Sequence, residues 1–236
     1  AAADINYTIN ATNGAGVVVR GGQGADTITT GAGDDTFVIL GNLNAAQVDA
    51  YVTAGSAAAV GIDATIYIPD RIFEGYGPNP TAINQLIDNG ATLIVTVDCG
   101  SVSHESLAVA RERGIDLVVV DHHQVGTDLP PCHALVNPNR EDDLSGQGHL
   151  CAAGVVFLVV VNTLRRLRQR GDRRVADFDP LALLDLVALA TVCDVVPLKG
   201  LNRAYVVKGL IAARHMQNPG LSALLRKAAI GGPVTA

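Results

Sequence analysis

The sequence predicts an α/β protein built on a parallel β-sheet, preceded by a short segment of different composition. Apolar, β-branched runs alternate with helical stretches between residues 62 and 120, and polar residues follow directly after each run. The first 60 residues differ from the rest, because they carry one basic residue against five acidic ones and hold none of the histidines or cysteines. We therefore expect two regions, 1–60 and 61–236.

The overall composition excludes several classes of protein. Of the 236 residues, 48% are hydrophobic and the net charge is −6, which excludes a wholly disordered chain and a uniformly basic nucleic-acid coat. The longest apolar run, 150–161, is shorter than the roughly 18 residues of a membrane span, so we expect a core helix there and no span. No secretory signal peptide is visible, and the scattered cysteines favour a reducing compartment.

The first region contains a nine-residue repeat. Residues 21–29 fit the pattern G-G-x-G-x-D-x-U-x, and residues 30–38 repeat it with Thr30 in place of the first glycine. Such repeats form parallel β-rolls, in which Asp26 and Asp35 would supply oxygen ligands for Ca²⁺. Residues 14–40 resemble the RTX calcium-binding repeats of secreted and surface-layer proteins. The alternative is a Gly/Asp-rich segment of turns and strands that binds no metal.

The second region predicts strands and helices in strict alternation. We expect strands at 62–68, 91–97 and 115–120, and helices at 80–88, ended by Asn89-Gly90, and at 104–113, ended by Gly114. A largely apolar segment follows at 181–196, and short amphipathic helices with packing roles are expected at 205–214 and 221–229. We expect Asn137-Pro-Asn139 and residues 140–149 to form a surface loop.

Polar residues come directly after each predicted strand. Asp70, Asp98 and the run Asp121-His122-His123 would meet at the carboxyl edge of a parallel sheet, where ligands of α/β proteins bind. Bringing carboxylates and imidazoles together there costs free energy unless a cation binds between them. Mixed Asp/His ligation suits Mn²⁺ best. Asp194, within an apolar stretch, is a further ligand candidate. The alternatives are capping roles for the loop residues and a hydrogen-bonded, metal-free Asp194.

Four segments occur in a fixed order along the chain, and they are Tyr67–Gly77, Val97–Gly100, Asp121–His123 and Asp194–Leu198. Together they resemble the DHH phosphoesterase family, specifically its RecJ-type single-strand-specific DNA exonucleases, and the resemblance covers roughly residues 60–230. It implies a DHH phosphoesterase core that hydrolyses single-stranded DNA from the 5′ end with two Mn²⁺ or Mg²⁺ ions, and a cytoplasmic location.

The resemblance also implies a role for each matching residue. Asp98 would bridge the metals, and His122 and Asp194 would be further ligands. His123 would contact phosphate, with Asp121 orienting the histidines. Arg71 and Tyr76 would help to shape the substrate groove.

Two departures from the family pattern lead us to expect a partial core with weak or no exonuclease activity. No Asp-x-Asp motif precedes Tyr67, and no second domain that closes over the DNA follows. Two other interpretations stay open at this point. In the first, the chain is a non-enzymatic calcium-binding structural or surface-layer protein, located outside the cell or at its surface. In the second, it is an artificial fusion of two unrelated parts.

A cluster of arginines follows the predicted core helix. Six arginines lie between residues 165 and 174, and they could contact DNA phosphates. Basic side chains are also common at a solvated helix C-terminus, where the helix dipole favours them. On the sequence alone we favour the second interpretation.

Overall fold

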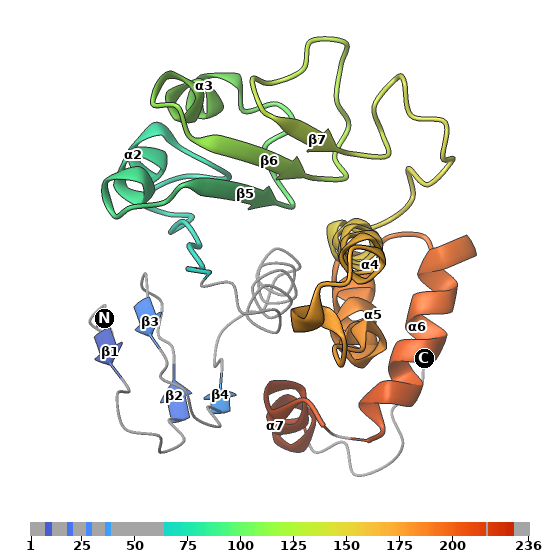
Figure 1. Ribbon diagram of the computed structural model, residues 1–236. Helices are drawn as coiled ribbons and strands as arrows, with labels where there is room; N and C mark the ends of the chain where they lie inside the picture. The colour runs from blue at the N-terminus through green and yellow to red at the C-terminus, as the bar shows by residue number, and fades with distance from the viewer. Residues whose placement is uncertain are drawn as a thin grey trace. The chain divides into compact units, whose positions relative to one another are not determined.

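A computed structural model describes residues 64–215 and 217–228, together with the backbone of four short strands nearer the N-terminus (Figure 1). The chain divides into two compact units. One comprises residues 1–43 and 210–236, and the other comprises residues 44–209. No helix in the described part of the chain is both long and apolar enough to cross a bilayer.

The first unit contains β1 (Thr8–Asn10), β2 (Val18–Arg20), β3 (Thr27–Thr29) and β4 (Thr36–Val38). Strand β1 pairs in parallel with β3, and β2 pairs in parallel with β4. Such pairing of alternate strands is what the predicted β-roll requires. The predicted calcium ligands Asp26 and Asp35 lie outside the described residues. The unit also includes helix α7 (Pro219–Lys227), whose N-terminus is capped by the side chain of Asn218.

The second unit is built on the predicted parallel sheet. Its strands β5 (Leu93–Val97), β6 (Asp116–Val120) and β7 (Ala134–Val136) pair in the order β5-β6-β7, all in parallel. Strands β5 and β6 fall where the sequence predicts them. Strand β7 was not predicted, because three residues are too few to show a periodic pattern.

The strand predicted at 62–68 is wrong over the residues that the structure describes. Residues 64–70 pair with no described strand, although their β-branched content suits one. Asp70 therefore does not follow a strand of the sheet as expected, and its carboxylate accepts hydrogen bonds from the backbone N–H groups of Ile72 and Phe73. A strand needs a neighbour to pair its backbone groups, and side-chain propensity alone does not supply one.

Helices cover both faces of the sheet, as a parallel sheet requires. On one face, α2 (Pro80–Asp88) and α3 (His104–Glu112) pack against Leu117 and Val119 of β6. On the other face, Val118 and Val120 join the cluster formed with α4 and α5. Successive residues of β6 therefore point to opposite faces, and both sets meet apolar side chains.

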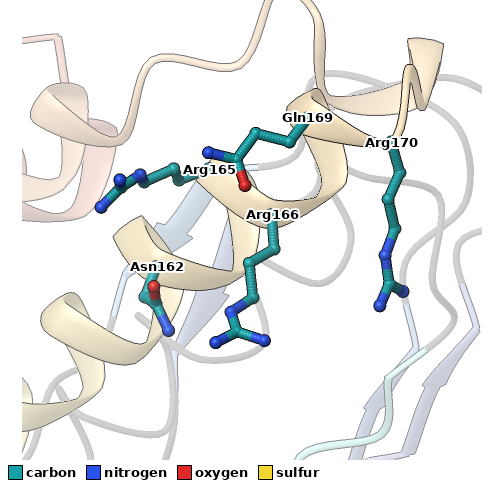
Figure 2. Close-up of a pocket in the computed structure, with 5 residues that line it drawn as sticks. All are labelled: Asn162, Arg165, Arg166, Gln169 and Arg170. Carbon is teal, nitrogen blue, oxygen red and sulfur yellow. The ribbon is translucent and has the colours of Figure 1, made fainter.

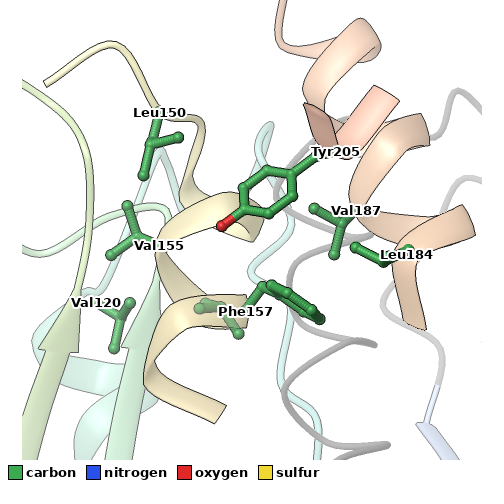
Figure 3. Packing of buried hydrophobic residues seen from close by; sticks show 8 residues of the cluster. Val120, Leu150, Val155, Phe157, Leu184, Val187 and Tyr205 are labelled. Carbon is green, nitrogen blue, oxygen red and sulfur yellow. The ribbon is translucent and has the colours of Figure 1, made fainter. Parts of the chain in front are cut away.

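The helical layer consists of α4 (Ala152–Gln169), α5 (Leu184–Cys193) and α6 (Gly200–Ala213), with 3₁₀ turns at Arg173–Val175 and Pro180–Leu183. Figure 3 shows the core between them, where Phe157 meets Tyr205 edge-to-face with ring centroids 5.4 Å apart. Gly209 lets α6 approach α5 closely, because a Cβ at this position would lie 2.1 Å from the carbonyl oxygen of Leu184. This close approach joins α6 to the first half of α5.

Candidate metal centre

The ends of three elements bring the predicted ligands together. Asp98 follows β5, His122 lies just after β6, and Asp194 caps the C-terminus of α5. The Nε2 atom of His122 lies 3.1 Å from Oδ1 of Asp98 and 3.5 Å from Oδ2 of Asp194. The imidazole is thus placed between two carboxylates that are 96 residues apart in the sequence.

These three side chains show why a cation fits. Oδ1 of Asp98, Nε2 of His122 and Oδ2 of Asp194 are all buried, and none makes a hydrogen bond of acceptable geometry. Buried polar atoms are normally paired, so three such atoms facing one another indicate a missing partner. Oxygen and imidazole nitrogen donors are the set that Mn²⁺ accepts. The residues therefore fit a divalent metal ion.

The charges at the centre act on one another strongly. Burial lowers the pKa of His122, but the adjacent carboxylate of Asp98 and the negative charges of Asp194 and Asp121 outweigh burial and raise that pKa to about 9. Burial, with the nearby charge of Asp98, raises the pKa of Asp194 against the opposing effect of the histidines. Without a metal, a proton on His122 therefore supplies the positive charge that the carboxylates need.

The backbone selects which nitrogen of His122 faces the carboxylates. Its Nδ1 lies 3.0 Å from the carbonyl oxygen of Leu150, and a carbonyl can only accept, so Nδ1 carries a hydrogen. In the neutral ring, Nε2 then presents its lone pair toward Asp98 and Asp194. This is the arrangement in which a metal-ligating histidine is held by a hydrogen bond on its other nitrogen.

Asp121 organises the loop that carries both histidines. It is 1% exposed, and its Oδ1 accepts hydrogen bonds from the N–H groups of His122 and His123 and from the ring Nδ1 of His123, at 2.7, 3.2 and 2.7 Å. Its Oδ2 accepts from the N–H of Ser101 at 3.0 Å. Burial alone would raise the pKa of Asp121, but the hydrogen bonds to His123 and Ser101 lower it overall. Asp121 stays ionised, which suits the predicted orienting role.

His123 lies at the edge of the centre and is partly exposed. One ring nitrogen of His123 can join Asp98 and His122 in a group whose ligand atoms all lie within 4.8 Å of one another. Since Asp121 holds Nδ1, the free Nε2 is the atom that can meet a phosphate oxygen. The phosphate contact of His123 stays a prediction.

Arg71 and Tyr76 lie together in the segment before α2. The guanidinium carbon of Arg71 is 5.4 Å from the centre of the Tyr76 ring, and both side chains are exposed. Burial of part of the ring, followed by the charges of Asp98, Cys99 and Asp121, raises the pKa of Tyr76. Arg71 and Tyr76 thus contact each other, and their part in a substrate groove stays a prediction.

The predicted loop is confirmed over residues 137–149, which form no helix or strand, but Asn137 departs from it because its side chain is buried. Its side chain is 3% exposed and donates hydrogen bonds to Oγ of Ser101 at 2.8 Å and to the carbonyl oxygen of His123 at 2.9 Å. Asn139 donates from Nδ2 to the carbonyl oxygen of His122 at 2.5 Å. Asn137 directly follows β7, so the rule that found Asp98 and Asp121 would have found it too, had the short strand been recognised.

Asn202 is a second residue that the sequence did not reveal. It is 0% exposed, and its Nδ2 donates to the carbonyl oxygens of His149 and Pro197, at 2.6 and 3.1 Å. His149 precedes Leu150, which holds His122, and Pro197 follows closely after Asp194. Asn202 therefore ties together the two backbone segments that position these ligands.

The backbone at the centre adopts conformations that side chains disfavour. Asp98 has φ of 61° and the β-branched Val195, next to Asp194, has φ of 57°. At Gly100, with φ of 110°, a Cβ would lie 2.6 Å from Oγ1 of Thr96, so only glycine fits. Such conformations cluster at functional sites and persist where surrounding contacts hold them.

Comparison with known proteins identifies the family to which the chain belongs. The N-terminal domain of the DHH family matches residues 24–191 of the chain. The chain is 38% identical over 195 residues to the single-stranded-DNA-specific exonuclease RecJ of Dickeya dadantii, which covers 80% of the chain and 34% of that relative. It is 33% identical to the RecJ of Bacillus subtilis over 89% of the chain and 23% of that relative. The chain thus spans about a quarter to a third of these proteins.

Solved structures agree with the sequence comparison. A crystal structure of exonuclease RecJ bound to manganese aligns with a TM-score of 0.67 and 33% identity, over 80% of this chain and 46% of that one. The match to the family starts at residue 24, within the first region predicted from composition, and the position of the join between the two regions stays a prediction. The parallel sheet, the order of the four segments and these similarities show that the chain belongs to the DHH family.

Proposed function

We propose that this chain hydrolyses phosphodiester bonds with a divalent metal ion, Mn²⁺ or Mg²⁺, and acts from the 5′ end of single-stranded DNA. The observation that supports this most is the convergence of three unpaired buried atoms, from Asp98, His122 and Asp194, at the carboxyl edge of a parallel sheet. The similarity to RecJ exonucleases, one of them solved with manganese, supports the choice of substrate and metal. Such DNA is found in the cytoplasm of a bacterial cell, where we place the activity.

Each residue of the centre has a distinct part in the proposed reaction. Asp98, His122 and Asp194 hold the ion, which lowers the pKa of a bound water and so supplies a nucleophile near neutral pH. His123, with its Nδ1 held by Asp121, presents Nε2 to a phosphoryl oxygen and stabilises the charge that develops there. The exposed cation Arg71 attracts the phosphate of the substrate toward the centre.

We expect the proposed activity to be weaker than that of a family member that carries an Asp-x-Asp motif. No Asp-x-Asp motif occurs before Tyr67 in this sequence, so the residues named above account for one ion of the family's pair. A two-ion site stabilises both the attacking and the leaving oxygen, and a single ion gives up part of that stabilisation. We therefore expect slow turnover that depends on Mn²⁺ concentration.

The test is an exonuclease assay on 5′-phosphorylated, 3′-labelled single strands with Mn²⁺. We expect release of mononucleotides by the wild type, loss of that release in His122→Ala, and retention in His133→Ala. His133 is a matched control, because it also lies near an aspartate, with Nε2 3.2 Å from Oδ1 of Asp116, but is exposed. Equal activity of wild type and His122→Ala, or no mononucleotide release by the wild type at saturating Mn²⁺, would overturn the proposal.

We propose calcium binding by the repeats of the first unit as a second candidate function. The parallel pairing of the repeat strands β3 and β4 with the earlier strands β1 and β2 supports it, because a β-roll pairs alternate strands in this way. Replacing both Asp26 and Asp35 with Asn is expected to abolish Ca²⁺ uptake and to leave Mn²⁺ binding at the centre unchanged. Equal Ca²⁺ uptake by the variant and the wild type in calorimetry would remove this candidate.

A further inference from the structure

The C-terminal half of α4 gathers positive charge in a chain that is otherwise acidic. Six of the 17 Lys and Arg residues lie between residues 165 and 174, while the net charge of the chain is −6. Arginines close together on one surface repel one another unless anions lie between them. The structure separates those that have a partner within the chain from those that do not.

Two of the six arginines have structural roles. Arg168 donates to the carbonyl oxygens of Val175 and Phe178, and so holds the segment after α4 against the helix. Arg174 pairs with Asp172 at 2.7 Å. The other four form no ion pair and no side-chain hydrogen bond with any residue that the structure describes, and all four are exposed. They are Arg165, Arg166, Arg170 and Arg173.

Three of these free arginines share one hollow on the protein surface. Figure 2 shows Arg165, Arg166 and Arg170 around it, with the amides of Asn162 and Gln169 between them. The five positions recur at helical spacing along α4 and its C-cap, so they form one stripe, which we call the arginine stripe. Among the residues that the structure describes, the lining includes no carboxylate and no apolar side chain.

The helix dipole does not account for the whole stripe. Cations at a helix C-terminus are favoured only within the last turn, where Arg166 lies. Arg165 lies before that turn, and Arg170 lies four residues after Arg166, where a like charge is unfavourable. Guanidinium groups bind phosphate oxygens through paired N–H donors, and amides add further donors. The stripe has the chemistry of a phosphate-binding surface.

We propose that the arginine stripe binds the sugar–phosphate backbone of the single-stranded substrate outside the metal centre. This inference rests on the proposed function and adds a second contact to it. Helix α4 starts directly after Leu150, which holds His122, and Arg165 lies 15 residues further along. At about 1.5 Å per residue the two points are about 22 Å apart along the helix axis, or about 7 nucleotides of a stacked strand.

The lining of the stripe also defines how the strand is recognised. The stripe holds no aromatic side chain on which a base could stack, so binding depends on phosphates and not on sequence. Each phosphate contact releases counterions, which makes affinity fall with salt. A substrate too short to reach from the centre to the stripe gains nothing from it. Length dependence and salt dependence are therefore the two signatures of this surface.

The test compares two triple variants with equal changes of charge. One replaces Arg165, Arg166 and Arg170 with Gln, and the control replaces the exposed residues Arg111, Lys208 and Arg226 with Gln. Arg and Gln have similar helix propensities, so the folds are expected to be retained, which circular dichroism verifies. Binding to a 5′-phosphorylated oligothymidylate of about 20 nucleotides, well beyond the span above, is measured by fluorescence anisotropy over a range of salt.

The stripe variant is expected to lose about tenfold in affinity at low salt and to lower the slope of log affinity against log salt by about 2. The control variant keeps the wild-type slope. Hydrolysis of a thymidine dinucleotide is expected to be the same in the wild type and in the stripe variant. Equal loss in both variants, an unchanged slope in the stripe variant, or a wild type that binds no oligothymidylate would each overturn the inference.

Failure of the proposed function gives a different result from failure of the inference. If the stripe variant loses affinity as expected but His122→Ala hydrolyses DNA like the wild type, the metal-centre proposal fails and the phosphate surface stands. If His122→Ala is inactive and the stripe variant binds like the wild type, the centre stands and the inference fails. Affinity and hydrolysis are measured separately, so both outcomes can be read.

Discussion

Two Asp–His pairs lie at opposite ends of β6, and they contain the same chemical groups at nearly the same distance. At the carboxyl end, Nε2 of His122 lies 3.1 Å from Oδ1 of Asp98, and at the amino end, Nε2 of His133 lies 3.2 Å from Oδ1 of Asp116. The first two side chains are 13% and 8% exposed, whereas the second two are 58% and 70% exposed. Distance alone therefore does not distinguish a functional site from a surface contact.

What distinguishes the two pairs is burial and the number of partners. At the carboxyl end a second carboxylate, Asp194, completes the group, and Leu150 fixes the ring of His122. At the amino end water can solvate both side chains, so an ion there gains little from leaving bulk solvent. The comparison indicates that metal binding at the centre comes from atoms that are desolvated and held in place before the ion arrives.

The largest expected effect on Mn²⁺ affinity comes from replacing Asp194, the second carboxylate that only the buried pair has. Asp194→Asn keeps the size of the side chain but removes one negative charge and one ligand. We expect a fall in Mn²⁺ affinity of more than about 100-fold, because even residues that merely support a metal ligand change affinity by about 10–100-fold. Calorimetry with Mn²⁺ measures it. Retention of wild-type affinity would mean that the Asp98–His122 pair suffices and that the comparison drawn above is wrong.

A smaller effect is expected from Asn202, which supports the buried pair without contacting it. Asn202→Ala leaves the carbonyl oxygens of His149 and Pro197 without their donor, so we expect a loss of about 1–3 kcal/mol in the free energy of unfolding. Mn²⁺ affinity is expected to fall by about tenfold, since Asp194 and His122 lose a shared constraint. Denaturant unfolding and calorimetry give the two values.

The control for this change is Asn84→Ala. Asn84 also makes two side-chain hydrogen bonds, but they lie away from the centre. It donates to the carbonyl oxygen of Pro80 and accepts from the guanidinium of Arg113. It is expected to leave metal affinity unchanged. A loss of stability without a loss of affinity in Asn202→Ala would show that this asparagine serves folding alone.

Gly209 tests how much the close packing of α6 against α5 contributes to stability. Gly209→Ala forces α6 away from α5, because the added Cβ would lie 2.1 Å from the backbone of Leu184 and 2.3 Å from Cβ of Ala188. Overpacking of this kind costs about 1–3 kcal/mol of unfolding free energy. Thermal unfolding measures the loss. We expect the matched change Gly114→Ala to cost less, because the added Cβ there meets nothing within 4 Å and only the backbone with φ of 70° is strained.

The smallest effect is a dependence of stability on pH in the metal-free protein. The pKa of His122 is raised from 6.5 to about 9, so protonated His122 stabilises the fold fully below pH 6.5, and this contribution is lost as pH rises toward 9. We expect the free energy of unfolding to decrease over this window. In His122→Ala the decrease is expected to be absent. A wild-type stability that is constant from pH 6.5 to 9 would contradict the charge balance described for the centre.

The sequence predicted those parts of the centre that follow long strands. Val97 and Val120 end apolar runs of clear length, so the sequence alone brings Asp98 and His122 to one edge of the sheet. It could not place Asn137, because β7 has three residues, and it misplaced Asp70, because the segment before it finds no strand to pair with. Nor could it reveal Asn202, whose bond to His149 crosses 53 residues and depends on how α6 packs.

The measurement that tests the account most directly is Mn²⁺ calorimetry on two double variants. Asp98→Asn with His122→Ala removes the buried pair, and Asp116→Asn with His133→Ala removes the exposed pair with the same change in formal charge. We predict that the first variant loses Mn²⁺ binding and that the second binds like the wild type. Equal binding by both variants, or loss of binding in both, would contradict the assignment of the metal centre to the carboxyl edge of the sheet.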